Sequence, residues 1–151
     1  RDRSPSRGLG DVYKRQKMNI VMLLKPKETV AYIYEDSTIR QALEKMKAHS
    51  YTAVPVIDEY GKYVGTVSEG DFLWYIVEKQ TQGMKSQEKY FVRDLIRTDF
   101  NPSVKISVDM KELYERALNQ NFIPVTDDSG VFIGIVTRKD LISHFVDKSK
   151  L

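Results

Sequence analysis

Two short stretches of the chain carry the same pattern of residues that could bind a charged ligand. The first is 65–71 and the second is 134–140. Each has a glycine, two strand-forming residues, a hydroxyl residue (Ser68 or Thr137) and, three positions later, an aspartate. Each stretch follows a β-type run and precedes an apolar segment of helical period. We therefore expect each to be a strand that turns into a helix, with the hydroxyl residue at the N-cap.

Such a junction suits a phosphorylated nucleoside. The start of a helix offers free backbone N–H groups and partial positive charge to a phosphate. The hydroxyl of Ser68 or Thr137 can donate to a phosphate oxygen, the carboxylate of Asp71 or Asp140 can accept from two ribose hydroxyls, and the glycine leaves room for a ligand. The alternative is a capping box, S/T-x-x-D, which stabilises the helix start and needs no ligand.

The two junctions belong to a longer internal duplication. Pro55, Gly61, Gly65, Ser68 and Asp71 each recur, as the same or a similar residue, 69 positions later. The apolar positions of the preceding helix recur 71 positions later, so the second copy has lost two residues in the loop before its proline. A duplication of this length predicts two structural units of one kind that share a core.

The chain resembles a tandem pair of CBS domains, also called a Bateman module, over about residues 18–148. The resemblance rests on 51–58 leading to 65–71, and on 121–125 leading to 134–140. It implies an α/β (α+β) fold of two β-α-β-β-α repeats packed about a pseudo-two-fold axis. It also implies adenosine ligands in the clefts between the repeats and a disc-like homodimer.

Composition and charge divide the chain into four parts. Residues 1–17 carry six basic and two acidic side chains, a net charge of +4. The whole chain has a net charge of +3, so the remaining residues have a net charge of −1. We expect the non-periodic stretch 1–17 to be a non-native or disordered leader; a nucleic-acid-binding arm is the alternative. We then expect repeat 1 at 18–80, a polar linker at 81–90 and repeat 2 at 91–148.

Hydrophobic periodicity and turn residues locate the expected elements. Short helices or turns are expected at 19–24 and 92–96. Longer helices are expected at 38–48, capped by Asp36 and Ser37, at 70–79, up to 119 behind the cap Asp109, and at 138–147. Strands are expected at 30–34, 53–57, 62–67, 104–106, 122–126 and 131–136.

Several functional classes lack the residues they need. There is no cysteine, so disulfides and thiolate metal sites are excluded. His49 and His144 share no metal-ligand spacing, and no nucleophile has a paired base. No apolar run reaches the roughly 20 residues of a membrane span, and there is no convincing signal peptide. We expect a cytoplasmic protein without catalysis, cofactor or metal, and with no nucleic-acid or membrane partner.

The resemblance implies a role for each residue of the two expected sites. Asp71 and Asp140 hold ribose hydroxyls, and Ser68 and Thr137 meet phosphates. Arg138 and Lys139 either contact phosphate or form an ordinary solvated helix end. Apolar side chains and backbone groups hold the adenine: Val30, Ala31 and Val104 line its slot, beside Tyr51, Thr52, Ala53, Val54, Asn121, Phe122 and Ile123.

We therefore expect a stand-alone ligand sensor whose regulated partner protein is unknown. The segments at 30–31, 50–55 and 137–139 look especially like the cyclic di-AMP-binding CBS proteins of Gram-positive bacteria. The presence of both aspartates expected to bind ribose, Asp71 and Asp140, favours AMP, ADP or ATP over cyclic di-AMP. Two alternatives remain: a regulatory fragment of a larger enzyme or transporter, and a ligand-free interaction module whose motifs are only helix caps.

Overall fold

The computed structural model describes residues 20–49, 51–79, 88–97 and 99–149. The expected leader at 1–17 lies outside the described residues, and so does the expected linker up to residue 87. None of the described helices is long and apolar enough to cross a membrane.

The first repeat is a three-stranded sheet with two helices. Its elements are β2 (Ile33–Tyr34), α2 (Ile39–His49), β3 (Ala53–Ile57), β4 (Tyr63–Ser68) and α3 (Glu69–Lys79). Strand β3 lies in the middle, parallel to β2 and antiparallel to β4. Ile39 and Ala42 of α2 and Phe72 of α3 are buried against this sheet.

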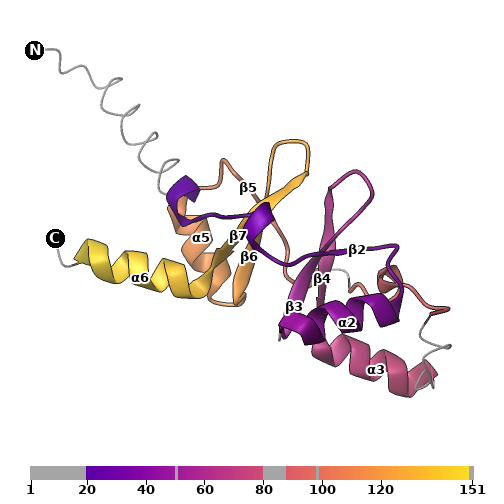
Figure 1. The fold of residues 1–151 in the computed structure, drawn as a ribbon. Coiled ribbons are helices and arrows are strands. Elements are labelled where there is room, and N and C mark those ends of the chain that lie inside the picture. The colour runs from indigo at the N-terminus through magenta and orange to yellow at the C-terminus, as the bar shows by residue number, and fades with distance from the viewer. Residues whose placement is uncertain (1–19, 50, 80–87, 98, 150–151) are drawn as a thin grey trace, which may run out of the picture.

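The second repeat has the same order of elements. It comprises the 3₁₀ helix η2 (Val92–Asp94), β5 (Val104–Lys105), α5 (Met110–Ala117), β6 (Phe122–Thr126), β7 (Phe132–Thr137) and α6 (Arg138–Ser149). Figure 1 shows α2 and α3 in one half of the molecule and α5 and α6 in the other. The predicted α/β (α+β) fold of two β-α-β-β-α repeats is confirmed.

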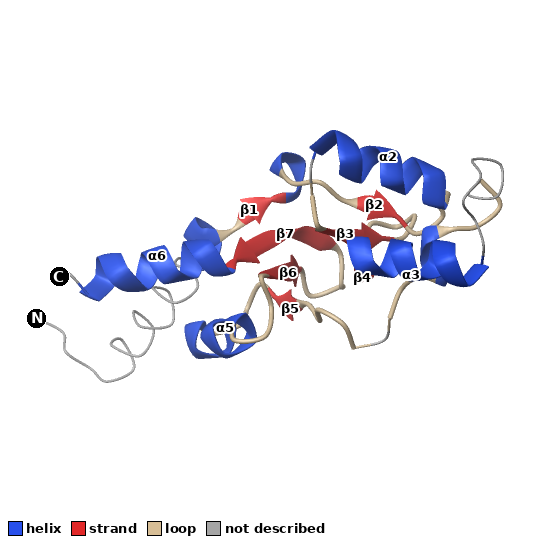
Figure 2. Ribbon diagram, turned by 90° about the horizontal axis from the view of Figure 1, so that it is seen from below, coloured by secondary structure: helices blue, strands red, loops and turns tan. Residues whose placement is uncertain are grey.

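The segments that precede the repeats cross over. Strand β1 (Lys25–Pro26) pairs with β7 of the second repeat, which places β1 beside β7 in Figure 2. Ile20 is buried in the core of the second repeat. Reciprocally, Val92 and Leu95 are buried in the core of the first repeat. Each core is therefore completed by a segment that leads into the other repeat.

Two glycines make room for these crossings. A Cβ on Gly65 would lie 2.5 Å from Cγ2 of Ile96, and a Cβ on Gly134 would lie 2.2 Å from the carbonyl oxygen of Lys25. Real Cβ atoms do not approach other atoms so closely, so a side chain at either position would push the crossing segment away. The sequence predicts that these glycines leave room for a ligand, but Ile96 occupies the space beside Gly65 and the Lys25 backbone occupies the space beside Gly134.

The expected first strand is shorter than predicted. In place of 30–34, only Ile33–Tyr34 forms β2, preceded by the 3₁₀ helix η1 (Lys27–Thr29). The reason is that the chain arrives from β1 on the other repeat and joins β3 only at Val56 and Ile57. Val30 and Ala31 are consequently left outside the sheet.

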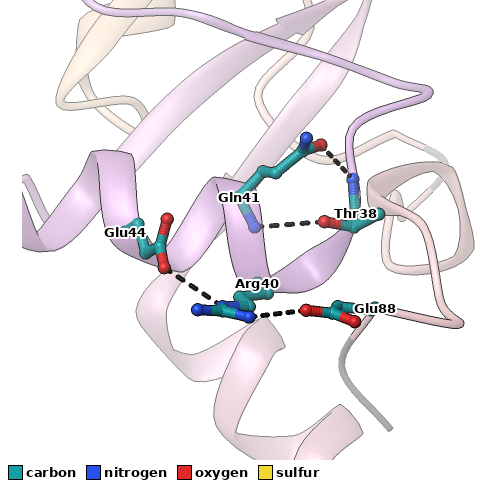
Figure 3. Close-up of polar contacts among 5 residues, drawn as sticks. All are labelled: Thr38, Arg40, Gln41, Glu44 and Glu88. Atoms are coloured by element: carbon teal, nitrogen blue, oxygen red, sulfur yellow. Dashed lines mark hydrogen bonds and ion pairs between the residues drawn. The ribbon is translucent and has the colours of Figure 1, made fainter. Parts of the chain in front are cut away.

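The start of α2 also differs from the prediction. The cap is Thr38 and not Asp36 or Ser37: the Gln41 amide N–H donates to Thr38 Oγ1 at 3.2 Å, and the Thr38 N–H donates to Gln41 Oε1 at 2.9 Å (Figure 3). This is a capping box with glutamine at the third position. Arg40 pairs with Glu44 and Glu88 beside it, which ties the end of the inter-repeat connection to α2. The predicted cap at Asp109 is confirmed.

Candidate functional site

Both strand-to-helix junctions form as predicted. The hydroxyl oxygen of Ser68 accepts from the N–H of Asp71 at 3.3 Å, and that of Thr137 accepts from the N–H of Asp140 at 3.1 Å. In the first junction Asp71 Oδ2 also accepts from the N–H of Ser68 at 2.9 Å, which completes a capping box. The hydroxyl residues therefore cap α3 and α6.

Each motif aspartate also pairs with a cation from a crossing segment. Arg97 Nε lies 2.9 Å from Asp71 Oδ1, and Lys25 Nζ lies 3.7 Å from Asp140 Oδ2. The Asp71 side chain is 12% exposed and that of Asp140 is 35% exposed. Asp71 is thus held by its own helix start and by Arg97, whereas Asp140 is more open to solvent.

A cavity of about 500 Å³ lies between the two repeats. This volume is within the usual range for a small-molecule site. The cavity brings together nine of the residues that the sequence predicts for ligand binding: Val30, Ala31, Tyr51, Thr52, Ala53, Val54, Asn121, Phe122 and Thr137. We call this cavity the central cleft.

Other predicted site residues lie elsewhere. Arg138 and Lys139 line a second cavity of about 400 Å³ that shares Asn121 and Thr137 with the central cleft. Arg138 Nε donates to the carbonyl oxygen of Ala117 at 2.7 Å, which ties its guanidinium to the end of α5. The remaining five are placed outside the lining of both cavities: Val104 and Ile123 are buried in the core of the second repeat, and Ser68, Asp71 and Asp140 lie at the helix starts.

The central cleft has lining residues that sequence reasoning missed. Lys25 and Thr29 come from the crossing N-terminal segment, and Thr66 and Ile135 occupy equivalent positions on β4 and β7. Asn101 and Gln120 precede β5 and β6. The repeat register identifies Asn101 and Gln120 as counterparts of Val30 and Tyr51, so aligning the two copies could have found them. Only the crossover brings Lys25 to the cleft.

Four polar side chains form a hydrogen-bonded cluster at one end of the cleft: Tyr63, Thr66, Asn101 and Gln120. Gln120 Nε2 donates to Asn101 Oδ1 at 2.9 Å, and Asn101 Nδ2 donates to Thr66 Oγ1 at 3.1 Å. The Tyr63 hydroxyl lies 2.7 Å from Thr66 Oγ1 and donates to the Asn101 carbonyl at 2.7 Å. Burial raises the pKa of Tyr63 to about 12, and its two hydrogen bonds oppose that rise.

Comparison with known proteins identifies two matching segments. The family described as CBS domain matches residues 23–78 and 92–147, together more than half of the chain. An uncharacterized protein of Methanocaldococcus jannaschii is 27% identical over 165 residues, covering 86% of this chain and 96% of that protein. The L-aspartate semialdehyde sulfurtransferase of the same organism is 27% identical over 116 residues. That match covers 76% of this chain and 21% of the enzyme.

Solved structures share the fold. A CBS domain protein from Streptococcus pneumoniae TIGR4 has a TM-score of 0.76 at 21% identity, over 92% of this chain and 94% of that one. CbpB in complex with c-di-AMP has a TM-score of 0.71 at 22% identity, over 91% and 99% of the two chains. CBSX2 in complex with AMP has a TM-score of 0.69 at 23% identity, over 86% and 97%.

Proposed function

The chain belongs to the CBS domain family, and on that premise we propose that it is a non-catalytic regulatory module that binds an adenine nucleotide in the central cleft. Tandem CBS modules are regulatory and bind adenine nucleotides. The central cleft supports this function because it joins an apolar slot, an open strand edge and a positive charge.

The open edge of β3 is the observation that carries the proposal. Strand β3 pairs with β4 along its whole length, but β2 joins it only at Val56 and Ile57. Ala53 and Val54 therefore have no described strand partner on the β2 side. Backbone polar groups require partners when they are covered. The edge of an adenine ring offers matching donors and acceptors, with Val30 and Ala31 of the same cleft against its apolar faces.

Charge in the cleft favours a phosphorylated ligand. Thr137, directly before α6, and Lys25, on the crossing strand β1 beside β7, line the central cleft. A cation, a hydroxyl and a helix N-terminus are suitable partners for a phosphate. Among the solved structures of similar fold, a CbpB structure is a complex with c-di-AMP and a CBSX2 structure is a complex with AMP. We assign the ligand to the class of adenine nucleotides, with AMP, ADP, ATP and cyclic di-AMP as the candidates.

Calorimetry on the purified chain tests the proposal. We expect AMP, ADP, ATP or cyclic di-AMP to bind, with GMP as the matched control for the base and adenosine for the phosphate. Binding should also raise the melting temperature, because a ligand at 100 times its Kd adds about 2.7 kcal/mol to the free energy of unfolding. No heat of binding and no thermal shift with any adenine ligand at millimolar concentration would favour a ligand-free interaction module instead.

We also propose that the chain forms a homodimer. Leu73, Trp74 and Val77 on α3 are largely exposed, and so are Ile142 and Val146 on α6. The repeat offset of 69 relates Leu73 to Ile142 and Val77 to Val146. Exposed apolar faces on both repeats are suited to a homodimer, and a partner protein would then read the change of shape or stability that the ligand causes.

A second candidate function is regulation within a longer polypeptide. The matched region is 21% of the sulfurtransferase, so that enzyme contains much more than this pair of repeats. The chain would then control the activity of a neighbouring domain by the same binding event. Expression of the full natural gene and the mass of its product distinguish the two cases.

A further inference from the structure

The four residues of the polar cluster differ from their counterparts in the other repeat. The repeat register pairs each of them with an apolar or aromatic side chain: Tyr63 with Phe132, Thr66 with Ile135, Asn101 with Val30, and Gln120 with Tyr51. The two ends of the central cleft are therefore chemically different although the fold repeats. We call the end with Val30, Ala31 and 51–54 the first-repeat half, and the end with Asn101 and 120–122 the second-repeat half.

The hydrogen bonds of the polar cluster link its members to one another. Thr66, Asn101 and Gln120 are all buried. Their hydrogen bonds form a chain when donation runs from Gln120 to Asn101, from Asn101 to Thr66, from Thr66 to Tyr63 and from Tyr63 to the Asn101 carbonyl. Asn101 has a φ of 56°, a left-handed conformation that asparagine tolerates better than most residues. The backbone thus turns this side chain into the cluster without a large conformational cost.

The same cluster occupies the strand edge of the second repeat. Strand β5 joins β6 only at Val125 and Thr126, so Phe122 has no described strand partner on that side, as Ala53 has none in the first repeat. The Gln120 side chain lies there: its Nε2 is 3.0 Å from the Pro102 carbonyl oxygen and 3.5 Å from the Phe122 carbonyl oxygen. In the first-repeat half the equivalent of Gln120 is Tyr51, which has no side-chain amide and is exposed at the cleft.

We propose that Asn101 and Gln120 act as a built-in occupant of the second-repeat half, so that one chain binds one adenine nucleotide, in the first-repeat half. This inference rests on the proposed function and determines its stoichiometry and location. A nucleotide entering the second-repeat half would have to break buried hydrogen bonds, and each buried polar group left unsatisfied is costly. A nucleotide entering the first-repeat half meets Val30, Ala31 and a free strand edge.

Calorimetric titration with AMP of the wild-type chain and three variants tests this assignment. Asn101→Gly removes the central side chain of the cluster and keeps a residue that accepts the φ of 56°. Ala31→Phe fills the slot in the first-repeat half. We expect one AMP per chain for the wild type, two for Asn101→Gly, none for Ala31→Phe, and one for the double variant. Thermal melting monitored by circular dichroism checks that each variant folds.

The outcomes separate this inference from the proposed function. Two AMP per wild-type chain, an Ala31→Phe variant that still binds one AMP, or a folded Asn101→Gly variant that stays at one would each overturn the single-site assignment and leave nucleotide binding intact. No binding of AMP, ADP, ATP or cyclic di-AMP by the wild type or any variant would overturn both. If Asn101→Gly does not fold, Gln120→Ala vacates the same half, and Thr52→Trp replaces Ala31→Phe if that variant is unstable.

Discussion

Arg97 Nε lies 2.9 Å from Asp71 Oδ1, although the two residues are 26 positions apart and Arg97 leads into the other repeat. The carboxylate that begins α3 is therefore joined to the segment that completes the core of its own repeat. Lys25 and Asp140 repeat the relationship at 3.7 Å. The two ion pairs therefore link the junction motifs to the segments that cross between the repeats.

Asp71 and Asp140 should differ in their effect on binding. Asp140 pairs with Lys25 and lies in the helix that Thr137 caps, and both Lys25 and Thr137 line the central cleft. Asp71 instead pairs with Arg97 and follows β4, which contacts Asn101. We expect Asp140→Ala to weaken AMP binding about ten- to a hundredfold, as for loss of a charged hydrogen bond of roughly 1.5–3 kcal/mol. Asp71→Ala is the matched control, since it removes the equivalent aspartate of the first junction, and should leave the Kd within about threefold. Equal losses in the calorimetric Kd would contradict a single site.

The ion pair itself should contribute modestly to stability. Arg97 is half exposed, so we expect Arg97→Ala to lower the free energy of unfolding by less than about 1 kcal/mol. Asp71→Ala also removes a capping residue and should cost about 1–2 kcal/mol. Urea denaturation of the two single variants and the double variant measures the coupling between the side chains. Strictly additive losses would show that Arg97 and Asp71 do not interact in solution.

Tyr63 should make stability depend on alkaline pH. Its folded pKa is about 12, whereas an unfolded tyrosine titrates near 10. The free energy of unfolding therefore falls between pH 10 and 12, because only the unfolded chain releases this proton there. Tyr63→Phe should be less stable than the wild type by roughly 1–2 kcal/mol at pH 9, and the difference should shrink by about 1 kcal/mol at pH 11. A constant difference between the two urea midpoints would contradict the burial of this hydroxyl.

Lys25 should raise the affinity for phosphorylated ligands relative to adenosine. It is half exposed and lines the central cleft, so its charge acts through partly screened contacts. We expect Lys25→Ala to weaken ATP binding several-fold more than adenosine binding and to flatten the salt dependence of the Kd for ATP. Lys111→Ala, at an exposed position of α5, is the control for net charge. Equal losses for ATP and adenosine would exclude a phosphate contact.

The exposed face of α3 should mediate self-association. Trp74 is 73% exposed, and a charge in its place would have to be desolvated in a dimer interface. We expect Trp74→Glu to convert a dimer into a monomer in sedimentation equilibrium without lowering the melting temperature of the monomer. Tyr60→Glu, at a similarly exposed hairpin position, should leave the dimer intact. A wild-type chain that is monomeric at 100 µM, about the concentration range of a weak association, would count against this interface.

The amino-acid sequence by itself determined the repeated local structure. Residues close in the chain decide helix starts, turns and strand alternation, so the junctions at Ser68 and Thr137 and the strands β3 and β6 follow from consecutive side chains. The duplication also predicts which positions are equivalent. Where the local signal was ambiguous, as at Asp36, Ser37 and Thr38, the cap was misplaced by one or two residues.

The tertiary structure decided what those repeated elements face. The crossover brings Lys25 to Asp140 and Arg97 to Asp71, and it shortens the first strand so that Val30 and Ala31 line the cleft. Asn101 reaches Thr66 across 35 positions of the chain, a contact that no local pattern records. Local propensity acts over only a few residues. These contacts depend instead on how one segment packs on the other repeat, because polar groups that are buried between the repeats need hydrogen-bond partners.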